Sequence, residues 1–339
     1  MKKTLFYFSF LVLILFSIKA HAQRVNTKYI QTFPYSITGK AFIGTKTNEF
    51  KVEDNLGPGR LSYRVAPAPR LGAGIAYKWF ALSGAFMRLG QPEEEEKGVT
   101  EEMDLQWNFY LRFLTIDFRL QQYKGYFLDN SSAIQNWREI NKNLYQRTDL
   151  ITSSIGGNIR YNLNYKKYST KAIYAQTERQ LKSAGSVSLG IRFNALGVLS
   201  DSSIVPSNLI NKLENFDLNQ LSFIDLGAGI GYGYTFVRGR WFFNVGFMGF
   251  IVNQNIKFEG NGILNEQTGS QLNFQSQTAI GYSNNNIYFG LTAVADQMYS
   301  RWADSKDIIY SFSKTRFMLA KRFHLKPVKK DKSDIWDQF

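Results

Sequence analysis

The chain has 339 residues, of which 44% are hydrophobic and 16% aromatic, with 27 glycines, 7 prolines and no cysteine. The lack of cysteine excludes disulfides, a lipid-modified N-terminal cysteine and cysteine-ligated metal sites. The formal net charge of +14 is typical of a protein with an anionic neighbour, such as nucleic acid, anionic lipid or lipopolysaccharide.

Residues 1–22 are predicted to be a cleaved secretory signal. Lys2 and Lys3 precede an apolar run over residues 5–18, and Ala20-His21-Ala22 follows as a small-x-small cleavage sequence. The run is short for a membrane span of about 20 residues, so we favour cleavage after Ala22 over a retained anchor. Loss of the three signal lysines lowers the net charge to +11. Export disfavours nucleic acid as a partner and favours outer-membrane lipid and lipopolysaccharide.

From residue 36 onward, apolar and polar side chains alternate with the period of two that β-strands produce. In residues 114–120, for example, Asp117 and Arg119 lie on the face opposite Ile116 and Phe118. The predicted strands are 36–51, 60–77 with an interruption at Pro67 and Pro69, 80–86, 105–111, 114–120, 151–161, 168–178, 187–194, 223–237, 241–258, 271–282, 287–296 and 308–323.

The pattern predicts an all-β fold, a transmembrane antiparallel up-and-down β-barrel in which tight turns alternate with long polar loops. Such barrels have even strand numbers, whereas the list has 13. We attribute the fault to residues 200–222 or to a strand split or merged elsewhere, and we predict about 12 strands, with 10 or 14 as alternatives. The only helical candidate is near 207–216. A soluble lipocalin-like barrel, with apolar faces inward, is the architectural rival.

The predicted boundaries are a signal at 1–22, an N-terminal periplasmic segment at 23–34, the barrel at 35–323 and a polar tail at 324–339. Residues 314–323 look like a closing strand whose final Phe323 is recognised by the barrel assembly machinery; Phe339 is the alternative. Trp79 and Trp241 border tight turns and are predicted to form an aromatic girdle at the headgroup level, with core packing as the alternative for Trp241.

Two charged groups are candidate lumen sites. The inward-facing row of Asp117, Arg119, Arg160 and Arg192 lines either an anion-preferring lumen or an interlocked network that closes it, and the sequence favours neither. The cluster of Glu178, Arg179 and Lys182 is predicted to hold a loop over the barrel mouth by ion pairing, with a ligand or gating cluster as the alternative. The acidic run at 93–96 is interpreted as a solvated loop rather than a divalent-cation site.

Four segments resemble a known family. They are Leu71–Trp79, Gln122–Phe127, Gln176–Ser186 and Asp201–Ser207, of which the block Thr177–Ser186 is the most specific. Together they resemble exported bacterial proteins catalogued as domain of unknown function four-four-two-one, over roughly residues 28–323. The resemblance implies an outer-membrane location and no assigned activity.

The two histidines, His21 and His324, fall in the predicted signal and tail, which leaves the predicted barrel without one. Serine needs an adjacent base to act as a nucleophile, so we expect no enzyme, no cofactor and no metal site. Three functions remain open: passive passage or binding of a small solute or lipid, which we favour; a structural or surface-interaction barrel with a closed lumen; and a histidine-independent lipid-modifying enzyme.

Overall fold

The computed structural model describes residues 25–54, 59–78, 80–89, 94–131, 134, 143–206, 218–260, 263–303 and 306–325. The predicted signal, Trp79, the helical candidate near 207–216 and the tail beyond residue 325 lie outside the described residues.

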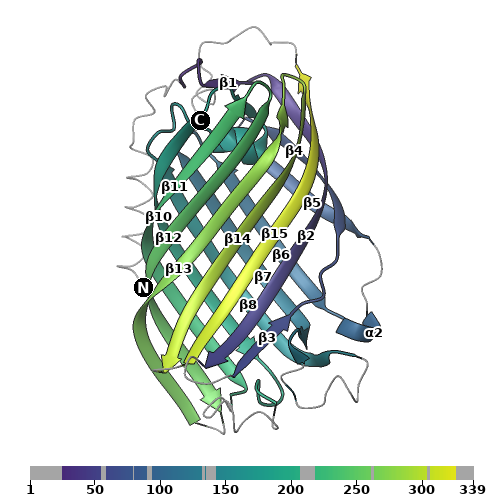
Figure 1. Ribbon diagram of the computed structural model, residues 1–339, viewed down its shortest axis with the longest axis vertical. Helices are drawn as coiled ribbons and strands as arrows, with labels where there is room; N and C mark the ends of the chain where they lie inside the picture. The colour runs from purple at the N-terminus through teal and green to yellow at the C-terminus, as the bar shows by residue number, and fades with distance from the viewer. Residues whose placement is uncertain are drawn as a thin grey trace, which may run out of the picture.

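Almost all of the described chain forms antiparallel strands that wrap into a barrel (Figure 1). Two short helical pieces accompany them, α2 at Glu94–Lys97 and a π-helix, η2, at Lys171–Ala175. The strands are β1 Ile30–Thr32, β2 Ser36–Asp54, β3 Arg60–Arg64, β4 Arg70–Tyr77, β5 Phe80–Arg88, β6 Glu101–Tyr110, β7 Leu114–Leu128, β8 Tyr145–Asn162, β9 Glu178–Gln180, β10 Ala184–Leu199, β11 Gln220–Arg238, β12 Trp241–Gly260, β13 Ile263–Ser283, β14 Ile287–Ala303 and β15 Lys306–His324.

The barrel closes by hydrogen bonding between its last and first long strands. β15 pairs with β2 over Ser36–Asp54, and β3 bridges β2 to β7. Among the described residues the closed ring consists of ten strands, namely β2, β3, β7, β8 and β10 to β15. Three further strands of the same sheet lie outside this ring: β4 pairs with β2, β5 pairs with β4, and β6 pairs with β7. The predicted barrel class is therefore confirmed, with ten strands in the ring rather than the favoured twelve.

The predicted strand at 168–178 is wrong. The chain there turns inward, forms η2 and then the short strand β9, which pairs with β1. Nearly every side chain from Tyr168 to Glu178 is buried, because the segment is enclosed by the barrel rather than placed in its wall. The odd strand number was attributed to 200–222 or to a strand split or merged elsewhere; the structure places the faults at 168–178, which is not a wall strand, and at 60–77, which is two strands, β3 and β4.

At one end of the barrel the strands are joined by turns of two or three residues, except between β8 and β10, where the chain enters the lumen. The other end has the long connections 89–100, 129–144 and 200–219, but only two residues lie between β12 and β13 and between β14 and β15. We call these two ends the turn end and the loop end; in outer-membrane barrels short turns face the periplasm. β1 and η2 lie at the turn end (Figure 1).

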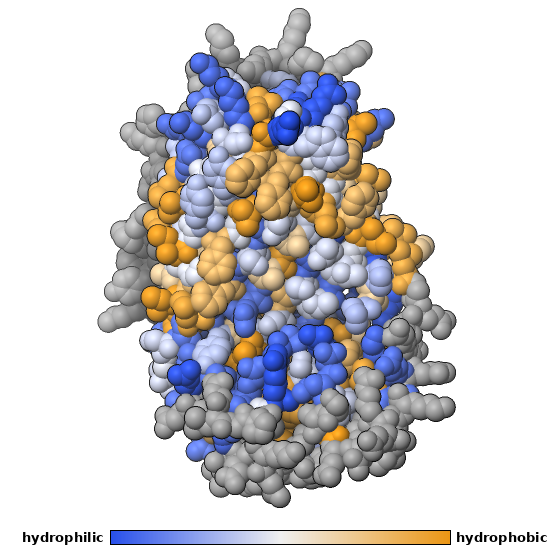
Figure 2. Space-filling model, viewed as in Figure 1, coloured by the Kyte–Doolittle hydropathy of each residue, from blue (hydrophilic) through white to orange (hydrophobic). Residues whose placement is uncertain are grey.

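Outward side chains form an apolar band around the barrel. Ile191, Ile230 and Phe247 are 58%, 62% and 54% exposed, and the intervening polar side chains point inward. Figure 2 shows hydrophobic side chains gathered over the middle of the molecule and hydrophilic ones toward both ends. An apolar exterior of this kind fits contact with lipid and is opposite to what the lipocalin-like rival requires.

No helix among the described residues is both long and apolar enough to cross a membrane.

The inside of the loop-end half is apolar as well, which the sequence pattern did not predict. Phe50, Phe223 and Tyr310 are fully buried there and belong to one large cluster with Leu61 and Ile256. The strands explain why, because β12 and β13 have 20 and 21 residues whereas about 9–11 suffice to cross a bilayer. We infer that the surplus length extends beyond the membrane and packs like the core of a soluble protein.

The first prediction tests the apolar band. Ile191→Lys places a charge at the middle of the outer face and should lower the free energy of unfolding by about 2–4 kcal/mol in lipid vesicles, because an ammonium at mid-bilayer is poorly solvated. The measurement is reversible denaturant unfolding in vesicles, with Ile191→Leu as the control. Equal stability of the two variants would mean that this surface meets water.

Candidate functional site

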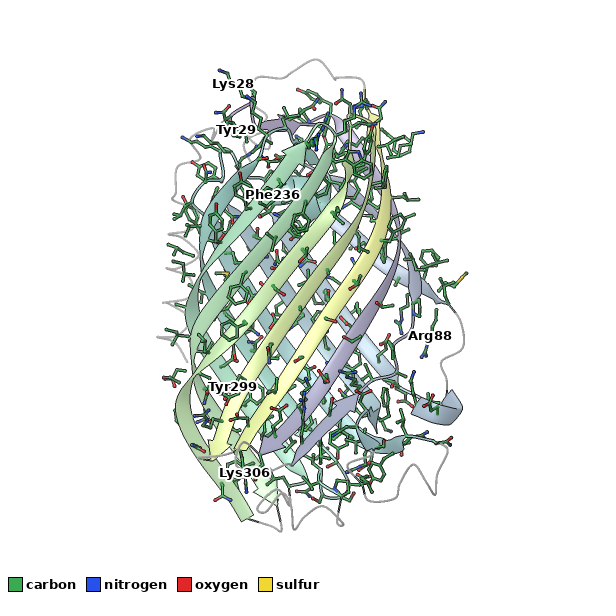
Figure 3. All side chains as sticks on the ribbon, viewed as in Figure 1. Lys28, Tyr29, Arg88, Phe236, Tyr299 and Lys306 are labelled. Atoms are coloured by element: carbon green, nitrogen blue, oxygen red, sulfur yellow. The ribbon has the colours of Figure 1, made fainter. Side chains whose placement is uncertain are left out.

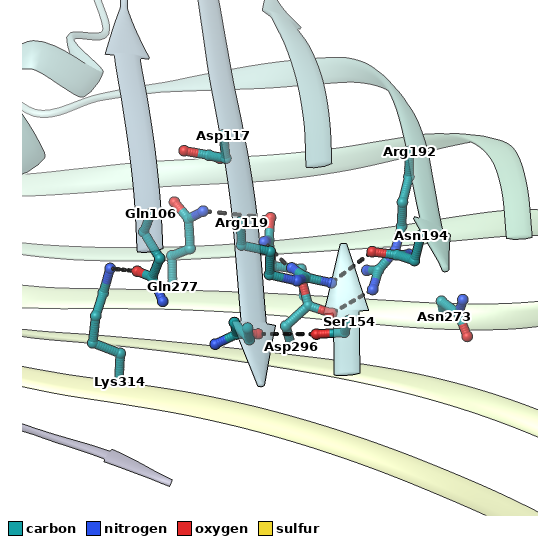
Figure 4. A network of polar contacts seen from close by, with 12 residues as sticks. Gln106, Asp117, Arg119, Ser154, Arg192, Asn194, Asn273, Gln277, Asp296 and Lys314 are labelled. Atoms are coloured by element: carbon teal, nitrogen blue, oxygen red, sulfur yellow. Dashed lines mark hydrogen bonds and ion pairs between the residues drawn. The ribbon is translucent and has the colours of Figure 1, made fainter. Parts of the chain in front are cut away.

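A layer of buried charges crosses the barrel at mid-height. Asp296 of β14 accepts hydrogen bonds from Arg119 Nη1 of β7 at 3.0 Å and from Arg192 Nη2 of β10, and Gln275 of β13 also donates to it. Arg119 Nη2 donates to Asn194 at 2.6 Å, so four strands meet through these side chains (Figure 4). We call Arg119, Arg192, Asn194, Gln275 and Asp296 the charge layer.

Arg192 is the most deeply enclosed member of this layer. Its side chain is fully buried, and its guanidinium lies 5.4 Å from the centre of the Phe250 ring. The two guanidinium groups share the Asp296 carboxylate, and a second buried carboxylate, Asp225, accepts a hydrogen bond from Asn194 of the layer. Asp117 and Arg160 form a separate ion pair at 2.6 Å, and Asn108 also donates to Asp117. The geometry of the predicted inward charges is thus that of the interlocked alternative, and sequence reasoning missed its central acid, Asp296.

Residues 168–180, which we call the plug, fill the turn end of the lumen. Asn244 Nδ2 donates to Tyr168 Oη at 3.1 Å, and Tyr174 Oη donates to Asn244 Oδ1 at 3.2 Å. Tyr174 also stacks on Tyr110 of β6, with ring centres 6.1 Å apart. Arg322 of β15 donates through Nε to the carbonyl of Gln176 at 2.9 Å. The plug is therefore held by side chains from β6, β12 and β15.

The cluster of Glu178, Arg179 and Lys182 is only partly brought together. Glu178 is buried, accepts a hydrogen bond from Ser169 and forms an ion pair with Arg112 Nη1 at 3.1 Å. Arg179 points to the carbonyl of Gly239, and Lys182 lies over the Tyr29 ring. The ion-pair partner of Glu178 thus comes from the β6–β7 turn and not from its neighbours in sequence.

A cavity of about 120 Å³ lies between the plug and the charge layer. Tyr174 lines it on the plug side, and Arg119 and Asp296 line it on the other. Lys40, Lys314 and Arg316, from β2 and β15, also face it. We call this space the basic cavity.

The three cations of the basic cavity lack carboxylate partners among the described residues. Lys314 Nζ donates to the amide oxygen of Gln106 at 2.6 Å (Figure 4), and Arg316 lies 4.5 Å from the centre of the Phe42 ring. Lys40 has neither a hydrogen-bond nor an ion-pair partner within the described part of the chain. The two acids of the cavity, Asp117 and Asp296, are already paired with arginines. The cavity therefore carries a surplus of positive charge that suits an anionic group.

One side of the cavity is formed by two strands that do not pair with each other. Ala81, Leu82 and Ser83 of β5 line it together with Gln106 and Asn108 of β6. Among the described residues β5 pairs only with β4 and β6 only with β7, so two strand edges face each other without a hydrogen-bonded ladder. We call this gap between β5 and β6 the seam.

The family model DUF4421, domain of unknown function, matches residues 24–323. The chain belongs to this family. The resemblance predicted over residues 28–323 is therefore confirmed, and no curated protein matches the DUF4421 chain.

Solved structures similar to this DUF4421 protein are outer-membrane barrels. The outer membrane protease OmpT from Escherichia coli is 10% identical with a TM-score of 0.39, covering 88% of this chain and all of its own. The Pseudomonas putida toluene transporter TodX is 10% identical with a TM-score of 0.29, covering 86% and 91%. Neisserial surface protein A is 8% identical with a TM-score of 0.21, covering 84% and 97%. The likeness concerns the fold alone.

The barrel of this DUF4421 protein contains a histidine, contrary to the sequence prediction. β15 runs one residue past the predicted barrel end and includes His324. Its Nδ1 lies 2.7 Å from Ser36 Oγ and its Nε2 lies 3.0 Å from Asn286 Oδ1. Ser36 is only 3% exposed, so its hydroxyl is poorly placed to meet a substrate.

Of the remaining predicted sites, Trp241 is at the surface. Trp241 is 54% exposed at the turn end and makes edge contacts with Tyr282 and Phe289, which fits a girdle position. Its proposed partner Trp79, like the start of the acidic run, lies outside the described residues. Within the described ranges no group of three or more acidic or histidine side chains is placed to hold a metal ion.

The second prediction concerns the charge layer. Asp296→Asn keeps the shape of the side chain but leaves Arg119 and Arg192 without their hydrogen-bonded carboxylate, so the free energy of unfolding should fall by about 3–5 kcal/mol. The control is Asp225→Asn, because Asp225 accepts hydrogen bonds from the neutral amides of Asn194 and Asn273 and its loss should cost less. Denaturant unfolding in detergent measures both. A smaller loss for Asp296→Asn would contradict the assigned geometry.

The third prediction concerns the pH dependence of the plug. Burial lowers the pKa of Lys171 from 10.5 to about 8, against an opposing effect of Glu178, and Arg112 lowers it further. States in which Lys171 is exposed therefore bind more protons between about pH 8 and 10.5, so plug docking should strengthen as pH rises through that window. Hydrogen-exchange protection of residues 168–178, corrected for intrinsic rates, should be higher at pH 9.5 than at pH 7.5.

Lys171→Met should remove this pH dependence, whereas Lys166→Met, at an exposed position next to the plug, should preserve it. Persistence of the full effect in Lys171→Met would assign it to another group.

Proposed function

We propose that this barrel is a binding protein for a small anionic group, held in the basic cavity, and that it is neither an open channel nor an enzyme. The observation that carries the proposal is the set of three cations, Lys40, Lys314 and Arg316, that face one cavity without a carboxylate partner among the described residues. Phosphate and carboxylate groups accept charge-assisted hydrogen bonds from such side chains. An uncompensated cluster of cations is unfavourable until an anion joins it.

Three features disfavour passage along the barrel axis. The plug occupies the turn end, the charge layer crosses the middle, and the apolar cluster packs inside the loop-end half. A solute that crosses from end to end would have to displace all three. The lumen is therefore better suited to holding a ligand than to conducting one, and the surface-interaction alternative, which requires no ligand, is separated from the proposal by a binding measurement.

Catalysis receives little support from the one serine–histidine contact. The contact at Ser36 and His324 lies at the turn-end rim, and neither residue lines the basic cavity. A buried hydroxyl cannot meet a substrate acyl group without rearrangement, and no other histidine is present in the barrel.

The cellular setting is part of the proposal. We propose that the chain is exported with residues 1–22 removed after Ala22, is inserted by the barrel assembly machinery and resides in the outer membrane among lipid and lipopolysaccharide. The apolar band and the barrel architecture support this location.

The fourth prediction tests binding at equilibrium, without regard to how the ligand enters. Inorganic phosphate present during both folding and unfolding should stabilise the protein in maltoside detergent, because a ligand that binds only the folded state shifts the equilibrium. The triple variant Lys40→Gln, Lys314→Gln, Arg316→Gln should bind phosphate at least tenfold more weakly. The measurement is the shift of the denaturation midpoint with phosphate concentration.

The control removes three charges elsewhere, in Lys28→Gln, Lys124→Gln, Lys257→Gln, whose exposed lysines lie outside the cavity. At the same ionic strength, phosphate should shift the denaturation midpoint of this control as much as it shifts that of the wild type. Equal midpoint shifts in wild type and triple variant, or steady ohmic channels in planar bilayers, would overturn the proposal.

A further inference from the structure

We infer that the basic cavity opens sideways into the membrane through the seam, and that its ligand is an amphiphile whose anionic headgroup enters between β5 and β6 while its apolar chain stays in the seam. This inference rests on the proposed function and adds the route and the chemical class of the ligand.

The seam begins where the barrel wall divides into two flaps, the β4–β5 hairpin on the side of β2 and β6 on the side of β7. β2 pairs with β3 over Glu49–Glu53 but with β4 over Ile37–Gly44. β7 likewise pairs with β3 at Phe127 and Leu128, but with β6 over Thr115–Lys124. The wall is thus continuous through β3 at the loop end and divided toward the turn end.

The division follows from the local sequence. Pro67 and Pro69 lie between β3 and β4, and proline can neither donate a ladder hydrogen bond nor continue a central strand. The β4–β5 hairpin leaves the ring at this point. In Figure 3, Arg88 at the end of β5 lies at the margin of the molecule, away from the barrel axis.

Unpaired strand edges are costly where they face hydrocarbon. Each unsatisfied backbone group in a bilayer costs several kcal/mol, which is why membrane barrels are normally closed. β5 is exposed on both faces along almost its whole length, unlike the other long strands of the wall. A strand that is solvated or lipid-covered on both sides is easily displaced, so the seam is the part of the wall best able to widen.

The two sides of the seam have the polarity of an amphiphile. Leu82 and Phe86 of β5 are 56% and 71% exposed, and Trp107 of β6 is exposed as well, all within the apolar exterior. Behind them lie Lys40 and Arg316 of the basic cavity. A molecule that lies across the seam would place its chain against apolar side chains and its headgroup among cations.

The volume of the cavity favours a headgroup over a whole ligand. About 120 Å³ is well below the roughly 300–1,000 Å³ of pockets that enclose drug-sized ligands. The plug and the charge layer limit the cavity along the barrel axis, so the remainder of a larger ligand has room only toward the seam. An amphiphile would use this room for its apolar chain, whereas a free anion would not need it.

Polar contacts limit how far the seam stands open. Arg70 of β4 forms an ion pair with Glu102 of β6 at the loop-end side of the seam, and Lys46 of β2 pairs with Asp104 of β6 at 2.8 Å. Farther toward the turn end, among the described side chains, the contact to β6 from the opposite wall is Lys314 with Gln106. A headgroup that binds Lys314 would replace Gln106 as its hydrogen-bond partner. The β6 flap would then lose one of the contacts that fix it to the opposite wall.

The fifth prediction closes the seam in the folded protein. Because the chain has no cysteine, Leu82→Cys with Leu105→Cys places two outward thiols on opposite sides of the seam, to be joined by a flexible bis-maleimide after folding is verified. Dodecyl phosphate, presented in nanodiscs, is the probe, and native mass spectrometry counts the bound molecules. If the two cysteines are linked before the protein meets dodecyl phosphate, the number of bound molecules should fall at least tenfold. If they are linked after dodecyl phosphate has bound, the protein should keep the probe under conditions in which the unlinked protein releases it.

The matched control links Ile159→Cys with Ile191→Cys, which lie opposite each other in the continuous wall of β8 and β10. That linkage should leave uptake unchanged, and dodecyl maltoside should not be retained by either protein. Unchanged uptake in the seam-linked protein, with phosphate stabilisation intact, would overturn the lateral route and leave the binding function standing. If phosphate does not stabilise the wild type, the proposed binding function itself is wrong.

Discussion

The backbone hydrogen-bond ladder is the constraint on which this barrel depends. In hydrocarbon every amide and carbonyl must be paired within the protein, and the pairing of β15 with β2 and of β3 with both β2 and β7 closes the ring. The same constraint makes the gap between β5 and β6 conspicuous, because it leaves two edges unpaired beside an apolar exterior. β13 and β14, which within the described residues pair only over Phe274–Ser283, also separate toward the loop end, but the gap between β5 and β6 is the one beside the basic cavity. A barrel that pairs its strands over most of its circumference and leaves two edges unpaired beside a cavity can admit a ligand there.

What fills the cylinder follows from its length and its glycines. The strands are longer than a bilayer requires, so the loop-end half packs an apolar core, and the charge layer crosses the middle. Toward the turn end, inward positions of β11 are glycines. A Cβ at Gly233 would lie 2.6 Å from the Tyr168 hydroxyl, so the missing side chain is what lets the plug reach the wall. The plug and the core together leave the basic cavity as a small space between them.

The wall could be predicted from the sequence, and the interior could not. Period-two alternation located the long strands and their outward faces, because one face meets lipid along each of them. Residues 168–178 were misassigned because Tyr168, Thr170, Ile173 and Tyr174 have high strand propensity, which burial on all sides overrides. Asp296 gave no local signal, since its partners are 177 and 104 residues away in sequence. The alternating glycines of β11 were the available sign that something packs against that face.

The surplus charge of the chain has a local component that stability does not explain. Asp296 and Asp117 are matched by arginines, so their networks hold the barrel together. Lys40 and Arg316 contribute no such link, and like charges that share a small cavity repel one another. The repulsion between these residues destabilises the empty barrel, and an anionic ligand bound between them would remove it. These residues lie behind the unpaired edges of β5 and β6 rather than at either mouth of the lumen, so their charge is next to a part of the wall that the ladder leaves open.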